Sequence, residues 1–361
     1  MIRVLNMFMF VANVAFVALL GFCYLSPSLN PEYFWPVALL GLSYPVLLVG
    51  NILFIVYWAF QLKLKFLYSL IAIAGGFSHI SEVVQFNGRP AEPGGRQLRI
   101  ATFNTQLQGY YEKKSFADTI GGFIKQNKYD VVCLQEFINV EKVLTSTLEK
   151  LKRQSGLEYM YFQVLDDKRK KGEYGSIILS RYPIVRSGKL EFENSGNLCI
   201  YADIAAGSDT FRVYNTHLQS FRFKKDDYNL LGDMPTDGDK AMKQSKGLLR
   251  RMREAYIKRA EQVQEMREHI DNYERGNMII CGDFNDPPMS YTYGQLSTGM
   301  KDAFIESGSG IGNTYIGKMP SFRIDYILHS PYFRAFDYQD HILTSDHRLV
   351  ETTLKLGGSG N

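Results

Sequence analysis

Cysteine and net charge are both scarce in this sequence, and each shortage excludes a class of protein. Only four cysteines occur among 361 residues, each in an apolar run and none at the spacing of a metal knuckle: Cys23, Cys133, Cys199 and Cys281. We therefore expect buried, unreactive thiols and no disulfide framework. The net charge is only +4, so overall basicity does not point to a nucleic-acid-binding protein.

Apolar runs, by contrast, are long at the start of the chain. Val4 to Leu25 is almost continuously apolar, and Phe34 to Phe60 is interrupted only mildly, by Pro45 and Asn51. Both runs are long enough to cross a bilayer as helices. The alternatives are a signal peptide, although the first run lacks a clear small-residue cleavage site, and two buried helices of a soluble protein. The lengths favour membrane spans.

A third run, Phe66 to Phe77, is shorter and reaches spanning length only by taking in polar residues beyond it. It fits either a third span or a helix in the membrane interface. We predict an integral membrane protein in which residues 1–84 form an anchor of two or three transmembrane helices in a lipid bilayer.

Basic residues indicate the orientation of this anchor. Arg3 precedes the first run, Lys63 and Lys65 follow the second, and the loop from Ser26 to Tyr33 has no Lys or Arg. The positive-inside rule then places the N-terminus and the Lys63 loop in the cytoplasm. With three spans the rest of the chain lies on the non-cytoplasmic side, and with two it is cytoplasmic. We expect three, although three arginines soon after the third run favour the opposite.

Composition divides the remainder into a Gly- and Pro-rich linker (85–97), a soluble domain (98–356) and a flexible tail (357–361). Ser220 to Gly247 is a long polar segment without an assignment. The helix predicted over Leu248 to Tyr273 begins with a basic stretch. That stretch fits a phosphate-rich partner or anionic lipid, and it fits a solvated helix face better.

The clearest candidate site residues stand where apolar strands end. Met278 to Cys281 predicts a buried strand, Gly282 stops it, and the prolines at 287 and 288 prevent further regular structure. Asp283 and Asn285 are thus held on a stiff turn at the lip of a sheet. Alone this signal is weak, because an ordinary loop after a strand has the same composition.

The same arrangement recurs along the domain, in RIATFN, YDVVCLQE, FRVYNTH, FRIDYIL and ILTSDHRLV. A strand-end Glu is often simply exposed, and a lone His is usually structural. An acid inside a strand-like run, as in FRIDYIL, needs a partner when it faces a core. Several such residues together favour one shared site. These further candidates are Asn104, Glu136, His217, Asp325, Asp346 and His347.

The chemistry of this set suggests an ion and a reaction. The ligand-type groups of Glu136, Asn104 and Asp346, with Asp283 as a further candidate, are carboxylate and amide oxygens, which suit a hard cation, Mg²⁺ or Mn²⁺. Such an ion keeps positions free for phosphate oxygens. The histidines handle protons, and an Asp that accepts a hydrogen bond from an imidazole raises its basicity. The set therefore predicts attack of water on phosphorus.

Seven stretches resemble, in order, the motif series of the endonuclease/exonuclease/phosphatase superfamily: TFNTQ, LQEF, GSIILSRYPI, NTHL, GDFND, FRIDYI and SDHRLV. That superfamily includes pancreatic-type deoxyribonucleases, abasic-site endonucleases, neutral sphingomyelinases and inositol-polyphosphate phosphatases. The resemblance covers residues 98–356. It implies an α/β (α+β) fold, a four-layer sandwich of two mainly antiparallel sheets flanked by helices, here preceded by transmembrane helices.

The resemblance also implies which residues hold the metal. Glu136 resembles the principal Mg²⁺ ligand of the superfamily. Asn104 and Asp346 resemble groups that assist it, directly or through water. Mn²⁺ is a possible substitute for Mg²⁺ at such a site.

The remaining residues correspond to catalytic groups. His347 resembles the histidine that activates the attacking water, oriented by Asp325. Asp283 resembles the aspartate that positions water or handles a proton, and the family leaves open which of Asp283 and His347 is the base. Asn285 and His217 resemble groups that bind phosphoryl oxygens as charge builds in the transition state.

Together these observations predict a membrane-anchored, Mg²⁺-dependent phosphoesterase that hydrolyses phosphodiester or phosphomonoester bonds. The substrate would be a lipid head group, an inositol phosphate or a nucleic acid. A DNA or RNA endonuclease or exonuclease of the same fold is one alternative, for which a continuous basic groove would be expected. A catalytically silent, membrane-bound binding module is the other, and the complete set of catalytic residues argues against it.

Overall fold

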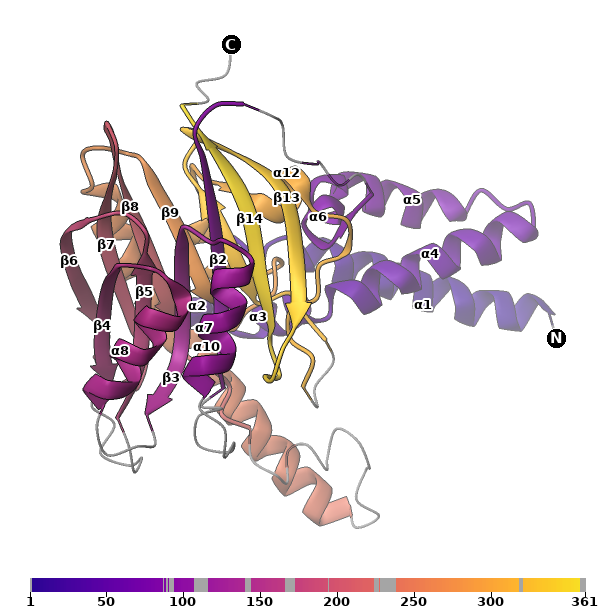
Figure 1. Ribbon diagram of the computed structural model, residues 1–361. Coiled ribbons are helices and arrows are strands. Elements are labelled where there is room, and N and C mark those ends of the chain that lie inside the picture. Colours follow the sequence, from indigo (N-terminus) through magenta and orange to yellow (C-terminus); the bar gives the residue numbers. More distant parts are fainter. Residues whose placement is uncertain are drawn as a thin grey trace.

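Two six-stranded sheets, packed face to face, form the centre of this computed structural model (Figure 1). The structure describes residues 2–86, 88, 90, 94–106, 116–139, 144–165, 173–193, 195–223, 227, 238–317 and 321–357. Parts of the predicted linker, the predicted tail and the Ser220 to Gly247 segment therefore lie outside the described residues.

The first sheet has the strand order β13-β14-β2-β3-β5-β4. All neighbours are antiparallel except β2 and β3, which run parallel and end on the same edge. The strands are β2 (Gln97–Asn104), β3 (Val131–Asn139), β4 (Tyr159–Leu165), β5 (Glu173–Ser180), β13 (Phe333–Ile342) and β14 (Arg348–Leu356).

The second sheet repeats this plan with the order β10-β12-β9-β8-β7-β6. Again one central pair, β8 and β9, is parallel and the others are antiparallel. The strands are β6 (Ile184–Glu191), β7 (Leu198–Ala206), β8 (Asp209–His217), β9 (Met278–Asp283), β10 (Lys301–Asp302) and β12 (Asp325–His329).

Apolar side chains from both sheets interdigitate in one buried core, to which Ile100, Val213 and Ile279 belong. Helices α7 (Phe116–Gln126) and α8 (Leu144–Ser155) cover the outer face of the first sheet. Helices α10 (Gly238–Asp271) and α11 (Tyr291–Leu296) cover the second. The predicted four-layer sandwich of two mainly antiparallel sheets is confirmed. All four cysteine thiols are buried, as predicted.

The N-terminal region forms a bundle that projects from one side of the sandwich (Figure 1). Its three long members are α1 (Ile2–Cys23), α4 (Tyr44–Phe60) and α5 (Phe66–Gly75). Helix α1 alone is long and apolar enough to cross a membrane. The pairs α3 (Pro36–Leu42) with α4, and α5 with α6 (Phe77–Val83), reach that length only together, across bends of 64° and 69°.

The first bend corrects the expectation of a mild interruption at Pro45 and Asn51. The helix ends at Leu42 and α4 starts afresh at Tyr44. Pro45, in the first turn of α4, has no amide hydrogen, and its ring would clash with the preceding turn of a continuous helix. Asn51 interrupts nothing, because its amide donates to the carbonyls of Phe16 and Leu47 inside the bundle.

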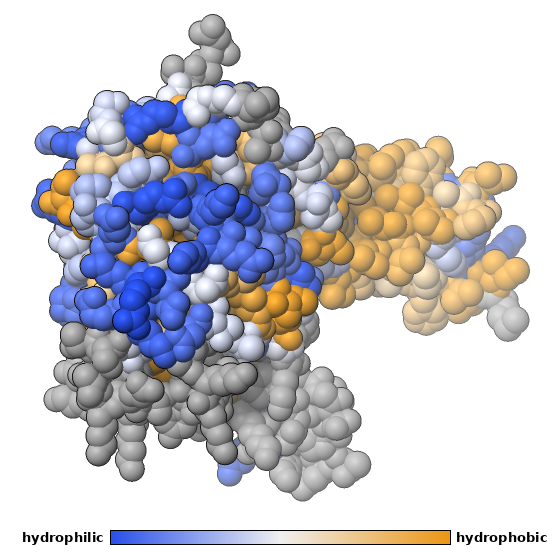
Figure 2. Space-filling model, in the orientation of Figure 1, coloured by the Kyte–Doolittle hydropathy of each residue, from blue (hydrophilic) through white to orange (hydrophobic). Residues whose placement is uncertain are grey.

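Several polar side chains face inward in this bundle, and many apolar ones face outward. The side chain of Asn13 donates a hydrogen bond of 2.6 Å to the Ser69 hydroxyl and accepts one of 3.0 Å from the Trp58 indole. Figure 2 shows apolar residues over most of the visible bundle surface, and Val4 and Phe8 are among the exposed ones. Such a surface is costly in water, whereas interhelical hydrogen bonds of this kind hold helices together in lipid.

The bundle is also packed directly against the sandwich. Strand β1 (Val84–Gln85) pairs with β11 (Gly310–Ile311), so the predicted linker begins inside a small sheet. The Arg323 guanidinium donates to the Glu82 carbonyl at 2.8 Å. Short helices α2 (Pro31–Phe34) and α3 lie between the bundle and α10, where Ala38 packs beside Met252 and Tyr256. The predicted anchor is therefore part of the folded unit, not a loosely attached tether.

Candidate functional site

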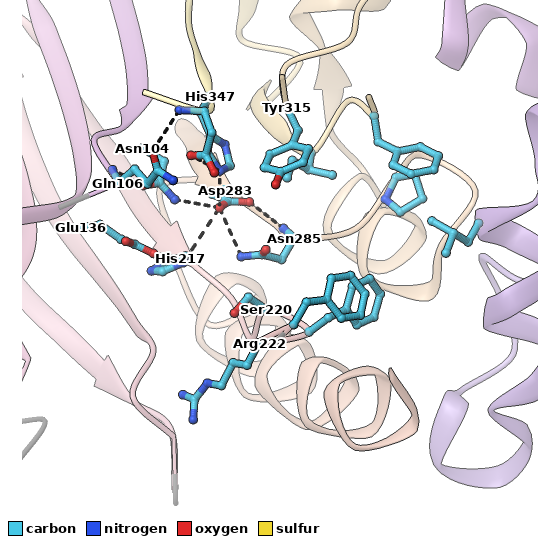
Figure 3. Close-up of a pocket in the computed structure, with 17 residues that line it drawn as sticks. Asn104, Gln106, Glu136, His217, Ser220, Arg222, Asp283, Asn285, Tyr315 and His347 are labelled. Atoms are coloured by element: carbon cyan, nitrogen blue, oxygen red, sulfur yellow. Dashed lines mark hydrogen bonds and ion pairs between the residues drawn. The ribbon is translucent and has the colours of Figure 1, made fainter. Parts of the chain in front are cut away.

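A pocket of about 250 Å³ opens where the strand ends of the two sheets meet (Figure 3). Seven of the eight candidate residues line it, and Asp325 stands directly behind His347. The predicted convergence is therefore observed. The polar lining consists of Asn104, Gln106, Glu136, His217, Ser220, Arg222, Asp283, Asn285, Asp346 and His347.

Asp283 is the hub of this group, at the end of β9. Its Oδ2 accepts a hydrogen bond of 2.9 Å from the side-chain amide of Asn104, which lies at the tip of β2 in the other sheet. Asn285 holds it from the same turn, with its backbone N–H at 2.8 Å from Oδ1 and its side-chain amide at 3.2 Å from Oδ2. Figure 3 shows these groups, with both histidines, directed toward one point.

The turn that carries Asp283 requires unusual backbone geometry. Gly282 has φ +132°, and a Cβ there would stand 1.9 Å from the Thr216 carbonyl oxygen of the neighbouring strand. Asn285 has φ +54°, a left-handed conformation that Asn tolerates better than most residues. The sequence GDFND thus satisfies two conformational demands that ordinary residues would meet only with strain.

A buried ion pair holds the same turn from outside the pocket. Asp286 binds the Arg259 guanidinium with both oxygens, each at 3.1 Å, and accepts from the Thr292 hydroxyl at 2.6 Å. Arg259 also donates to the Gln219 carbonyl at 2.6 Å. Sequence analysis placed Arg259 in a solvated basic face of the helix. That was wrong for this residue, which is fully buried because Asp286 neutralises it.

Glu136 reaches the pocket by a local irregularity. It was expected just beyond a strand end, but β3 continues to Asn139 and carries a bulge between Leu134 and Phe137. Glu136 has φ +50° there, so its carboxylate enters the pocket, while Gln135 points between the sheets and donates to Asn215 at 2.7 Å. Its Oε1 lies 3.4 Å from Nε2 of His217. A strained residue at a bulge is typical of a functional position.

His347 and Asp325 form a buried pair. Nδ1 of His347 is 2.9 Å from Oδ2 of Asp325, and the other ring nitrogen lies 3.7 Å from Oδ2 of Asp283. Asp325 begins β12 instead of lying within a strand, because residues 321–324 are irregular. The backbone N–H of Asp325 donates a hydrogen bond of 3.0 Å to the Thr314 hydroxyl. Asp325 thus contacts the pocket only through the imidazole.

Clustered carboxylates shift the proton affinities of the site. Burial lowers the pKa of His347, but the negative charges of Asp325, Asp283 and Asp346 outweigh it and raise that pKa to about 10. Burial raises the pKa of Asp283, with the nearby Asp325 charge adding to it. Burial, with Glu136 and Asp283 close by, raises the pKa of Asp346 to about 6. Excess negative charge of this kind is the environment that a cation relieves.

Two groups of residues are candidates for holding that cation. Ligand atoms of Asp283, Asp325 and His347 lie within 4.8 Å of one another, and a hydrogen bond already joins Nδ1 of His347 to Oδ2 of Asp325. Asp346 keeps one buried oxygen without a hydrogen-bond partner among the described residues, and the Glu136 carboxylate is partly open to the pocket. Glu136 and Asp346, with the Asn104 amide oxygen, match the oxygen donors that Mg²⁺ prefers.

The pocket also contains residues that sequence analysis did not single out. Gln106 accepts from the backbone N–H of Asp346 at 3.2 Å, and Tyr315 forms a bridge with His347 and packs edge-on to its ring at 5.4 Å. Gln106 stands two residues beyond the end of β2, in the motif TFNTQ, but Asn104 was the candidate chosen from that motif. Tyr315 follows no apolar strand, so no local pattern marks it. Phe221, Arg222 and Phe223 lie within the unassigned segment, where FRF is the one aromatic-basic cluster.

Comparisons with known proteins agree with this geometry. A family model described as "Endonuclease/Exonuclease/phosphatase family" matches residues 101–347, and one described as a domain of unknown function matches residues 6–83. No curated protein matches the chain.

Solved structures with the same fold are numerous. An endonuclease/exonuclease/phosphatase from Bacteroides vulgatus is 19% identical, with a TM-score of 0.51 over 72% of this chain and 99% of its own. A humanized TDP2 from D. rerio is 17% identical, with a TM-score of 0.51 over 72% and 98%. The human Nocturnin catalytic domain, with bound sulfate, is 16% identical, with a TM-score of 0.50 over 72% and 94%. At these identities the likeness extends to the fold alone.

Proposed function

The chain belongs to the Endonuclease/Exonuclease/phosphatase family, and on that premise we propose that it is a membrane-anchored, Mg²⁺-dependent phosphoesterase acting on phosphodiester or phosphomonoester bonds. Members of this family are hydrolases of phosphate esters that use divalent metal ions. The observation that carries the proposal is the arrangement around Asp283, at the edge of the second sheet, where this carboxylate lies close to His217 of the same sheet and to Asn104 and His347 of the first sheet.

Each residue of this arrangement has a proposed part in the reaction. Glu136, Asp346 and Asn104 would hold Mg²⁺, which supplies positive charge for phosphate oxygens and for the developing negative charge. Asp325 fixes the tautomer of His347, because it accepts from Nδ1 and leaves Nε2 directed at the pocket. The charge of a bound Mg²⁺ would offset the carboxylates that raise the pKa of His347. Water would then lose its proton to the neutral imidazole of His347 or to Asp283, whose side chains face the same space.

The transition state gathers charge on the phosphoryl oxygens, and donors must stand ready for it. The amide of Asn285 and the imidazole of His217 border the same pocket and are fixed by their neighbours. Groups held in this way stabilise developing charge without reorganising during the reaction. We assign both residues to this task.

Membrane anchoring is the second part of the proposal. Helix α1 has 22 residues and spans about 33 Å, the thickness of a bilayer core. The N-terminus and the turn between α4 and α5 lie at the end of the bundle far from the sheets (Figure 1). Lys65 marks that end, with its ammonium 3.9 Å from the Phe10 ring centre. With basic residues on the cytoplasmic side, the catalytic domain would lie on the non-cytoplasmic side.

A direct test uses the full-length protein purified in detergent and bis-p-nitrophenyl phosphate as substrate. We expect turnover with Mg²⁺ or Mn²⁺, none with a chelator, and losses of at least a hundredfold in His347→Ala and Glu136→Ala. A panel of plasmid DNA, RNA, inositol phosphates and phospholipids then identifies the substrate. No metal-dependent turnover, with both variants indistinguishable from the parent, would favour a binding module instead.

A further inference from the structure

The pocket wall opposite the carboxylates is apolar, and the membrane anchor supplies part of it. Leu42, the last residue of α3, lines the pocket together with Phe221, Phe223 and Phe322. Figure 3 shows the acids and histidines on one side of the pocket and the ribbon of the N-terminal helices across from them. A phosphate ester bound at Asp283 would therefore have its other end beside the anchor.

From this arrangement we propose that the substrate is a phosphate ester of a bilayer lipid, whose hydrocarbon-bearing part lies along Leu42, Phe221 and Phe223. The proposal rests on the proposed function and specifies its substrate class. In the reaction, the oxygen of water joins phosphorus, one P–O ester bond breaks, and the leaving oxygen takes a proton.

The wall is held in place by contacts with buried residues. Phe221 stacks on Phe223 with ring centres 5.1 Å apart and meets the Tyr256 ring edge-on at 5.2 Å. The Arg259 guanidinium lies 4.7 Å from the Phe221 ring centre while it binds Asp286. One buried arginine thus fixes both the aromatic wall and the turn that carries Asp283.

The same wall continues toward the lipid-facing part of the molecule. Leu42 lies two residues before the start of α4, the helix that we place in the membrane, and packs in one cluster with Leu39 and Phe223. Before α3, Tyr33 is 81% and Phe34 55% exposed. Exposed aromatic residues at the end of a membrane helix are typical of the interface with lipid headgroups. A lipid could therefore reach the pocket without its hydrocarbon part crossing water.

A basic helix face beside this wall fits a membrane surface as well. The first half of α10 buries Leu248 and Met252 against α3, and its other face is exposed. That face carries one acidic residue, Glu254, with four basic residues and two apolar ones around it. The basic and apolar residues are Lys243, Lys246, Arg250, Arg253, Met242 and Leu249. Basic residues with apolar neighbours on one face suit a helix that contacts anionic lipid headgroups.

The test compares esters that share a phosphate group and differ in the rest. The full-length protein in dodecyl maltoside micelles receives Mg²⁺ and phosphatidylglycerol, phosphatidic acid, bis-p-nitrophenyl phosphate or a single-stranded DNA oligonucleotide. Phosphorus NMR measures hydrolysis of the lipids, absorbance measures hydrolysis of the soluble ester, and gel electrophoresis measures cleavage of the DNA. We expect kcat/KM for phosphatidylglycerol or phosphatidic acid to exceed that for either water-soluble substrate by at least tenfold.

Variants test the wall itself. Phe223→Ser should lower the ratio of lipid to soluble-ester kcat/KM by about tenfold, because a large apolar contact is lost. Phe223→Leu should restore most of that ratio, which separates a contact with lipid from misfolding. Val185→Ser, which removes an exposed apolar side chain from β6, is the matched control and should change neither activity.

The outcomes separate this proposal from the one on which it rests. Turnover of the soluble ester with no turnover of either lipid, or a preference for DNA, overturns the lipid assignment and leaves the phosphoesterase intact. A ratio equal in Phe223→Ser and the parent overturns the part given to the wall. No turnover of any substrate with Mg²⁺ or Mn²⁺ overturns both proposals.

Discussion

Nδ1 of His347 stands 2.9 Å from Oδ2 of Asp325, although the two residues come from different sheets. Asp325 is fully buried and has no surface on the pocket, so it acts only by setting the tautomer and orientation of the imidazole. It is a positioning residue in our proposal, and this distinction has measurable consequences.

Asp325→Asn should lower kcat for bis-p-nitrophenyl phosphate by about a hundredfold or more and leave KM within a few-fold of the parent value. The physical reason is that an amide can donate to Nδ1 and so favour the wrong tautomer. Steady-state kinetics measure both constants. Asp271→Asn, at the exposed end of α10, is the control and should match the parent. Equal changes in kcat and KM would contradict a positioning role.

Glu136→Gln should raise the Mg²⁺ concentration that gives half-maximal activity by tenfold or more, because one charged ligand is lost while the side-chain size is kept. Titration of activity with Mg²⁺, after chelator treatment, measures the shift. Glu254→Gln, on the exposed face of α10, serves as the matched control. An unchanged titration curve in Glu136→Gln would place the metal elsewhere, with Asp283, Asp325 and His347 as the remaining candidates.

Stability should depend on pH through Glu306, in α12 (Ala303–Ser307). Burial raises its pKa, but hydrogen bonds from His329, the Ala335 N–H and Lys301 outweigh that and lower it to about 2. A lowered pKa means that the stabilisation is complete above the unfolded-state value near 4.5 and is lost as the pH falls toward 2. The full contribution is about 3 kcal/mol.

Glu306→Gln should therefore lower the Tm of the detergent-solubilised protein at pH 7, and the difference from the parent should shrink as the pH falls from 5 to 3. Thermal unfolding followed by circular dichroism measures both. Glu191→Gln, which alters an exposed pair with Lys189, should shift Tm little at any pH. A Tm difference that stays constant with pH would exclude the charge of Glu306 as its source.

Topology can be read from engineered thiols, because all four native cysteines are buried. Val185→Cys, on the sandwich, should react with a membrane-impermeant maleimide in intact spheroplasts if the domain is non-cytoplasmic. Leu62→Cys, 95% exposed at the far end of the bundle, should react only after permeabilisation. The reverse pattern would place the catalytic domain in the cytoplasm and reject three spans.

Much of the fold was predictable because its signals are local. The apolar run before Asp283 predicted β9, the stretch FRVYNTH predicted β8, and helical spacing predicted most of α10. Strand continuity was less predictable. The pattern of apolar residues did not reveal that β3 passes through a bulge at Glu136. The register of β3 is set by its pairing with β5, which is distant in sequence.

The sequence by itself determined the residue types of the site, the apolar N-terminal region and the order of strand-end motifs. Only the tertiary structure decided that Asn104 meets Asp283 across 179 residues, that Asp325 stands behind His347, and that Leu42 of the anchor borders the pocket. The reason is that periodicity reports which face of an element is buried, while the partner on that face is chosen by packing between segments far apart in the chain.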